Sequence, residues 1–259
     1  GLLRFGPNVD YLDAVLASAL NVIVEENLDF VAPQTTPLVD ESSVEIIIPS
    51  HSGIPTFPAV DSDPTSEKIG ALIAGLIKDG DCIQTGIGAV PASIFSNLGN
   101  RSDLGLHGGL IDDGVMHLIE AGNLTGVRKS IDQNMHIIGM ALGSKNMLDG
   151  LAHSKQAGSV SFRGADYTHE ASVISQLDNF VSINSAVEVD LMGQVNSEVI
   201  AGRQVSGTGG SVDFMRAAKM SKGGRSIVAM SATAKGGSVS RIVPRVDVVT
   251  ALRTDVDIV

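Results

Sequence analysis

Two glycine-rich segments of this chain could hold a ligand against bare backbone. The first, DGDCIQTGIGAVPASIF at residues 79–95, passes from an apolar stretch through Gly86 and Gly88 to Pro91. Cys82–Thr85 is predicted to be a buried strand, and Pro91 suits the first turn of a helix. Amides at such a helix start can bind an anion or a carbonyl oxygen that gains charge. The segment therefore predicts either a ligand site or an ordinary packing turn.

A second glycine cluster, SGTGGSVDF at residues 206–214, also follows a strand-like segment and precedes a predicted helix. Two such corners indicate one shared site. On the second helix Arg216, Lys219 and Lys222 recur at intervals of three, which places their charges near one face. These side chains could attract phosphate groups, or they could form a solvated surface.

A third segment, LGLHGGLIDDG at residues 104–114, combines a histidine with two aspartates. His107, Asp112 and Asp113 could carry out acid–base chemistry. Asp-Asp-Gly runs also cap the helix that follows them, so a structural role is equally open. The other histidines show no ligand spacing with cysteine or acidic residues, and we expect no metal site.

The strand predicted over residues 181–192 has one polar face. With a period of two, Asn184, Ala186, Glu188 and Asp190 lie opposite an apolar set. Polar groups in such a strand must be hydrogen-bonded or face a cleft, which makes Asn184 and Glu188 candidate site residues. A sheet edge that faces water would give the same pattern.

Helices and strands that could position these residues alternate along the chain. A short helix is predicted over 10–20, and a passage rich in Pro, Ser and Asp through Pro64 is the best linker candidate. Asp63 can cap the next helix, which Gly80 should end. Its apolar stripe comprises Ile69, Leu72, Ile73, Leu76 and Ile77.

Later helices are predicted at 91–98, 113–121, 171–177 and 212–220, with strand-like segments between them. This alternation predicts an α/β fold, with a largely parallel sheet flanked by helices.

Composition narrows the class of protein. A chain of 259 residues with 43% hydrophobic content can bury a substantial core. A net charge of −11 without a basic run argues against a nucleic-acid or anionic-membrane partner. The single cysteine, Cys82, excludes an internal disulfide framework and fits a reducing cytoplasm, and we expect it to be buried rather than nucleophilic.

No apolar run is long enough for a membrane span, and no basic-then-apolar signal opens the chain. The chain starts at Gly1 and stops within a strand-like pattern at Val259. We therefore expect it to be an excerpt of a longer protein.

Several motifs in order resemble the acetyl-CoA hydrolase/transferase family, particularly its 4-hydroxybutyrate CoA-transferase branch. The resemblance runs from about residue 9 to the end, through DGDCIQTGIGAVP, LGLHGGLIDDGV, DYTHE, SINSAVEVDLMGQVNSE, SGTGGSVDF, SKGG and SRIVP. It implies two similar α/β domains with the active site between them, in a homo-oligomer. Residues 1–58 would be the tail of the first domain plus a linker, and 59–259 most of the second, lacking its C-terminal end.

The resemblance also implies an acyl-CoA:carboxylate CoA-transferase that moves coenzyme A between short-chain acids. Coenzyme A would then be a substrate rather than a tightly bound cofactor, and small carboxylic acids would be the other partners. The implied CoA-binding residues are Gly86, Ile87, Gly88, Ala89, Val90, Asn184 and Gly207, with Gly209 and Gly210 from the same glycine cluster.

One segment departs from the family pattern at the position of the family's nucleophile. Relatives carry His, then Ser or Thr, then Glu where this chain has His107, Gly108 and Gly109. That glutamate is the family's nucleophile: it forms an acyl-glutamyl anhydride and then a glutamyl-CoA thioester. Three hypotheses follow. In the first, the protein is a transferase whose nucleophile lies elsewhere, with Glu188, Asp112 or a residue of the missing first domain as candidates. In the second, it is a hydrolase in which a carboxylate activates water. In the third, it binds coenzyme A without catalysis.

Overall fold

A parallel sheet forms the centre of the molecule. The computed structural model describes residues 1–57 and 62–259 of the chain. Four parallel strands pair in the order β16 (Arg225–Val228), β11 (Phe180–Asn184), β5 (Cys82–Thr85) and β6 (Gly105–Leu106). A parallel bridge from His107 to Ile137 leads on to β8 (His136–Ile138), which pairs with β10 (Val160–Phe162). The parallel strands confirm the predicted α/β class.

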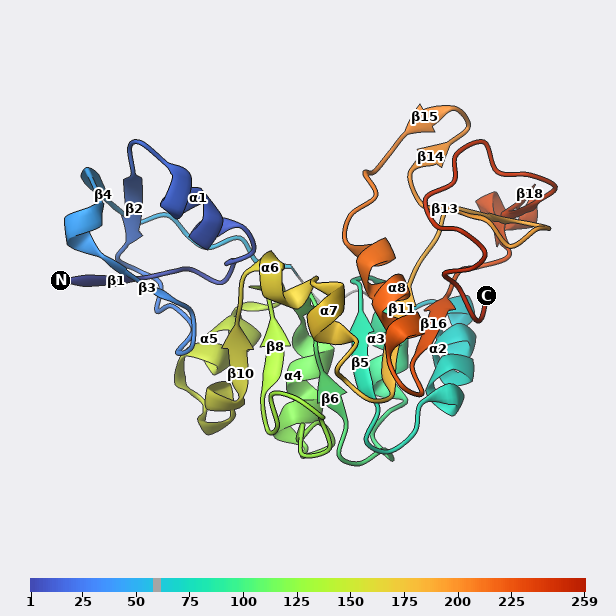
Figure 1. Cartoon of the computed structure of the whole chain (residues 1–259), viewed down its shortest axis with the longest axis horizontal. Coiled ribbons are helices and arrows are strands. Elements are labelled where there is room, and N and C mark those ends of the chain that lie inside the picture. The colour runs from blue at the N-terminus through green and yellow to red at the C-terminus, as the bar shows by residue number, and fades with distance from the viewer. Residues whose placement is uncertain (58–61) are drawn as a thin grey trace.

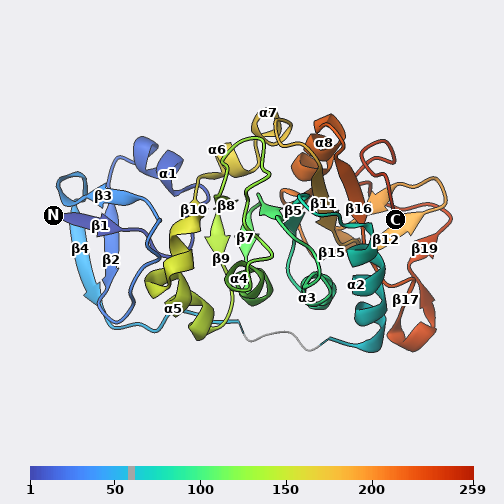
Figure 2. The same cartoon turned by 90° about the horizontal axis from the view of Figure 1, so that it is seen from below.

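Helices cover both faces of this sheet, as Figures 1 and 2 show. One layer contains α2 (Pro64–Leu76), α3 (Ala89–Ser96), α4 (Asp113–Glu120) and α5 (Lys145–His153). The opposite layer contains α6 (Ala165–Thr168), α7 (Ala171–Ile174) and α8 (Ser211–Met220). Parallel strands need crossover connections of this kind. In the described residues no helix has the length and apolarity that crossing a membrane would require.

The central strands are apolar because both of their faces are covered. Ile83 on β5 and both Phe180 and Val181 on β11 are fully buried. Cys82 begins β5 with 1% of its surface exposed, and burial raises the pKa of its thiol to about 12. The thiol is thus a small buried apolar group, as predicted from the sequence.

Helix α2 begins as predicted but ends earlier. The Asp63 side chain accepts hydrogen bonds from the N–H groups of Thr65 and Ser66, at 2.9 and 3.2 Å. The helix ends at Leu76, before Gly80, and Leu72 is 73% exposed. The predicted apolar stripe of this helix therefore included a residue, Leu72, that does not face the core. Gly70 turns another face inward, because its bare Cα lets α2 approach the backbone of α3 closely.

The N-terminal part forms two small sheets beside the central body (Figure 1). Strand β1 (Leu2–Arg4) pairs with β3 (Leu38–Asp40), and β2 (Ile23–Asn27) pairs with β4 (Ile46–Ser50), while α1 spans Leu12–Ser18. Val9 is nevertheless buried in the main core, and Asn8 bridges to Met140. The predicted domain boundary at 58/59 lies outside the described residues and stays a prediction.

The prediction of one continuous strand over residues 181–192 is wrong. Strand β11 ends at Asn184, and the chain resumes as β12 (Glu188–Asp190) in a separate sheet with β13 (Val195–Asn196) and β19 (Ile242–Val243). The guanidinium of Arg241 donates hydrogen bonds to the carbonyls of Ala186 and Val187 and fixes the chain at this break. Side chains on the two sides of this break therefore do not share the one polar face that a continuous strand would have.

The remaining strands form short pairs. Strand β7 (Leu110–Ile111) lies parallel to β9 (Met140–Ala141) next to the central sheet. Two hairpins extend from the C-terminal part: β14 (Val199–Ile200) with β15 (Arg203–Gln204), and β17 (Thr233–Ala234) with β18 (Val239–Ser240).

Candidate functional site

The two glycine corners line one cavity of about 460 Å³. Gly86 and Ile87 follow β5, and Gly207–Gly210 precede α8; Gly109 and Asn184 line the same cavity. The cavity opens at the carboxyl ends of β5 and β11, where parallel α/β sheets bind ligands. Segments far apart in the sequence therefore meet at one place in the fold.

Two helices with open N-termini follow the glycine corners: α8 begins at the cavity itself, and α3 begins just after Gly86 and Ile87, which line it. Gly88 precedes α3 with φ +119°, a conformation that disfavours other residues, and Gly210 precedes α8. Within the described part of the chain, no side chain caps either helix. Their first-turn N–H groups are suited to binding an anionic oxygen. Ala89 and Val90 belong to α3 itself, and neither they nor Gly88 line the cavity.

A hydrogen-bond network holds Gln84 and Asn184, two polar residues that line the cavity. Ser182 Oγ donates to Gln84 Oε1 at 3.0 Å, and Asn184 Nδ2 donates to Ser182 Oγ at 2.8 Å. Gln84 Nε2 also donates to Asn184 Oδ1 at 3.4 Å. These bonds satisfy polar groups at the ends of β5 and β11 and hold Asn184 in place. Gln84 was not predicted, although a glutamine inside an apolar strand was a usable signal.

Glu188 and Asp112, the predicted nucleophile candidates, do not line the cavity in the described structure. Glu188 lies on β12, and its carboxylate accepts a hydrogen bond from Asn196 Nδ2 at 3.2 Å. Asp112 caps α4 by accepting from the Val115 N–H at 3.0 Å, and burial raises its pKa. Each carboxylate therefore has a structural role.

We expect Glu188→Gln to leave kcat/KM for an acyl-CoA within about threefold of the parent, because a catalytic contact would be worth far more. Asp112→Ala should lower stability by about 1 kcal/mol through the lost cap, again without changing kcat. Steady-state kinetics and thermal denaturation measure the two effects. A loss of a hundredfold or more in kcat for Glu188→Gln would restore that residue as the nucleophile.

His107 and Asp113, the other acid–base candidates, also make structural contacts. His107 is fully buried among the rings of Tyr167 and Phe180, and burial lowers its pKa to about 3. The Asp113 carboxylate accepts from the Ser144 N–H at 2.8 Å and fixes the loop before α5. Neither residue lines the cavity in the described structure, which favours a structural role for both.

The three basic residues predicted near one face of α8 do not line the cavity either, within the described chain. Helix α8 ends at Met220, so the last of them lies beyond it. Each forms an ion pair with an aspartate: Arg216 with Asp255, Lys219 with Asp257, and Lys222 with Asp178. These contacts favour the solvated-surface interpretation.

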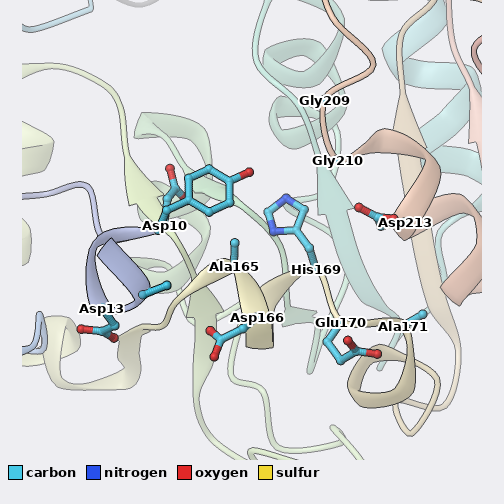
Figure 3. Close-up of a pocket in the computed structure, with 12 residues that line it drawn as sticks. Asp10, Asp13, Ala165, Asp166, His169, Glu170, Ala171, Gly209, Gly210 and Asp213 are labelled. Atoms are coloured by element: carbon cyan, nitrogen blue, oxygen red, sulfur yellow. The ribbon is translucent and has the colours of Figure 1, made fainter. Parts of the chain in front are cut away.

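His169 lines the cavity and was not among the predicted site residues. It also lines an adjoining cavity of about 560 Å³, where Figure 3 shows its imidazole between Asp10 and Asp213. A Cβ atom added at Gly109 would lie 3.2 Å from His169 Cε1. The ring thus fills the space beside Gly109, where the family pattern has its glutamate. Its sequence context, DYTHE, carried no chemical signal by itself.

Comparison with known proteins identifies the family. Residues 143–259 match the model described as "Acetyl-CoA hydrolase/transferase C-terminal domain". The whole chain is 38% identical to the 4-hydroxybutyrate coenzyme A transferase of Clostridium kluyveri and covers 60% of it. This chain belongs to the acetyl-CoA hydrolase/transferase family.

Solved structures of similar proteins support the family assignment. RipA from Yersinia pestis has a TM-score of 0.93 and 37% identity, over 100% of this chain and 59% of RipA. The 4-hydroxybutyrate CoA-transferase from Porphyromonas gingivalis has a TM-score of 0.86 and 34% identity, over 100% of this chain and 61% of that protein. This member of the acetyl-CoA hydrolase/transferase family thus spans about 60% of the length of such relatives.

Proposed function

We propose that this protein binds acyl-CoA between its two glycine corners and transfers coenzyme A between short-chain carboxylic acids. The main support is geometric: both corners, Gly109 and Asn184 line one cavity at the carboxyl ends of parallel strands. The similarity to 4-hydroxybutyrate CoA-transferases points to the same class of reaction. Coenzyme A is then a substrate that is released after turnover, and small acids are the other partners.

The open helix ends supply the electrostatic part of this chemistry. The free N–H groups at the starts of α3 and α8 carry a partial positive charge. They suit the phosphates of coenzyme A and the oxyanion that forms when a thioester carbonyl is attacked. Hydrogen bonds with Ser182 also hold Gln84 and Asn184, two polar side chains that line the same cavity.

A second candidate function, acyl-CoA hydrolysis, is favoured by Gly109. A glycine has no carboxylate on which coenzyme A could be stored as a thioester, whereas attack by water needs no such store. A third hypothesis, a protein that binds coenzyme A without catalysis, follows from the same missing carboxylate at position 109. Assays of the full-length protein with acyl-CoA donors and acceptor acids separate them. A transferase converts the donor thioester into a new acyl-CoA only when an acceptor acid is present, a hydrolase releases free coenzyme A without one, and a binding protein leaves the donor thioester intact.

The position of coenzyme A can be tested with two glycine variants. Gly86 and Gly207 line the cavity, and a Cβ atom at either would meet nothing within 4 Å in the described structure. Gly86→Val and Gly207→Val should each raise the Kd for coenzyme A at least about tenfold, since the added methyl groups enter the ligand's space. Isothermal titration calorimetry measures the change.

Gly75→Val on the exposed side of α2 is the matched control and should bind normally. These sites are better than Gly88 and Gly209, whose φ angles of +119° and +56° would strain any valine. An unchanged Kd in both cavity variants, with melting temperatures as in the parent, would remove the site assignment.

The proposal includes the homo-oligomer that the family resemblance implies, and sedimentation of the full-length protein tests it. A reducing cytoplasm stays the compartment predicted from the single cysteine.

A further inference from the structure

The Nε2 atom of His169 is directed at the space between Gly109 and Gly210. A Cβ atom at Gly109 would lie 3.3 Å from Nε2, and a Cβ atom at Gly210 would overlap the imidazole. Both glycines line the proposed CoA cavity. The ring is thus accommodated because Gly210 has no side chain, and a side chain at position 109 would press against it. It occupies the place where a side chain at position 109 would enter the cavity.

The imidazole is held in a fixed orientation. His169 Nδ1 lies 2.8 Å from Thr168 Oγ1, and Thr168 is fully buried. The ring packs against Phe214, with 4.6 Å between ring centroids, and the His169 N–H donates to the Ala165 carbonyl at 3.0 Å. When Nδ1–H donates to Thr168 Oγ1, Nε2 carries the free lone pair and faces the cavity.

The surroundings keep this imidazole neutral. Burial lowers the pKa of His169, while the carboxylates of Asp213 and Asp10 oppose that shift without reversing it. The same carboxylates lie on either side of the ring, as Figure 3 shows, and would stabilise a positive charge that forms there during a reaction. A neutral ring in the resting state and a stabilised cation in an intermediate are both required of a histidine nucleophile.

We propose that His169 is the covalent nucleophile of this protein and stores the acyl group as an acyl-imidazole. The role rests on the proposed binding of acyl-CoA. Nε2 attacks the thioester carbonyl carbon; the N–C bond forms, the C–S bond breaks, and coenzyme A leaves as the thiolate. The acyl-imidazolium carries the positive charge, and the proton stays on Nδ1.

The transfer is completed without a residue that carries coenzyme A. The carboxylate of the acceptor acid attacks the acyl carbon, the N–C bond breaks, and a mixed anhydride forms as the imidazole becomes neutral again. The thiolate then attacks the acceptor's carbonyl carbon of this anhydride, which yields the new acyl-CoA and releases the donor acid as its carboxylate. Water in place of the acceptor would give hydrolysis. The protein stores the acyl group here, whereas a glutamate stores coenzyme A.

Isotope exchange tests the proposal in the full-length protein. Acetyl-CoA is incubated with ¹³C-labelled free coenzyme A and no acceptor acid, and mass spectrometry follows label in acetyl-CoA. An acyl-imidazole predicts exchange, because labelled thiolate can attack the stored acyl group. His169→Ala should lower the exchange rate at least about a hundredfold, as expected for a lost nucleophile, with the Kd for coenzyme A within about threefold. His153→Ala, an exposed histidine on α5, is the matched control.

Added imidazole should restore part of the exchange in His169→Ala, since the free ring fits the vacated space; a purely structural role would not give this rescue. A parent protein that binds and consumes acetyl-CoA but exchanges no label would overturn the proposal while leaving the proposed function intact. Exchange that persists in His169→Ala would overturn it as well. If coenzyme A fails to bind the parent, the proposed function itself fails.

Discussion

The double variant Gly109→Glu with His169→Ala is expected to form a covalent glutamyl-CoA thioester, which the parent cannot form. The parent has no carboxylate at position 109, and the imidazole occupies the adjacent space. Removing the ring opens room for the new side chain, and the first N–H groups of α8, which lie at the same cavity, could bind the oxyanion. Compared with His169→Ala alone, transfer to an acceptor acid should rise by about 10²–10³-fold.

Borohydride treatment after acetyl-CoA addition measures the adduct, because it reduces a glutamyl-CoA thioester. Peptide mass spectrometry should find reduction between Leu104 and Gly114 in the double variant and none there in the parent. Gly109→Glu alone should gain less, since its Cβ atom would lie 3.2 Å from His169 Cε1 and the ring would have to shift. If a folded, CoA-binding double variant forms no adduct, the alignment of this segment with the family nucleophile is wrong.

Acid should destabilise the protein steeply below about pH 6.5. His107 and His136 are buried, and burial is the main cause that lowers their pKa values from 6.5 to about 3 and about 4. Below pH 6.5 the unfolded chain takes up a proton at each site while the folded chain does not, so protonation favours unfolding. Each histidine contributes a loss of about 1.4 kcal/mol per pH unit until its folded pKa is reached. Together they remove about 7 kcal/mol between pH 6.5 and pH 4, which is enough to unfold a protein at the lower end of the usual stability range of about 5–15 kcal/mol.

Urea denaturation at pH 7, 6, 5 and 4.5 measures this dependence. His107→Gln and His136→Gln should each remove about half of the slope, judged against each variant's own stability at pH 7. His117 and His153 are exposed, so glutamine at either should leave the slope unchanged. A free energy of unfolding that stays level between pH 6.5 and 5 would contradict the prediction.

Features fixed by neighbouring residues were predictable from the sequence. The Asp63 cap and Pro64 at the start of α2, and the strand–glycine–helix corner around Gly88, depend on a few consecutive residues. The parallel α/β class followed from the alternation of helices and strands. The meeting of the two glycine corners followed from the tendency of such corners to gather at one edge of a parallel sheet.

Features fixed by distant residues were not predictable. The break after Asn184 depends on hydrogen bonds from Arg241, which no local pattern reveals. The exposure of Leu72 depends on how closely Gly70 lets α3 approach. His169 is placed beside Gly109 by the packing of α6 against the sheet, and its own segment looked unremarkable. Long-range packing therefore placed the residue that we propose as the nucleophile.

The single cysteine can be used to measure how often the central sheet opens transiently. Cys82 lies in the central strand that leads directly into the first glycine corner, and its thiol is almost fully buried. An uncharged alkylating reagent can reach the thiol only when β5 separates from its neighbours, so the alkylation rate follows the population of opened molecules. A ligand that binds only the closed form slows labelling in proportion to its saturation. Binding of candidate acyl-CoAs can thus be ranked by thiol labelling alone, before any turnover is detected.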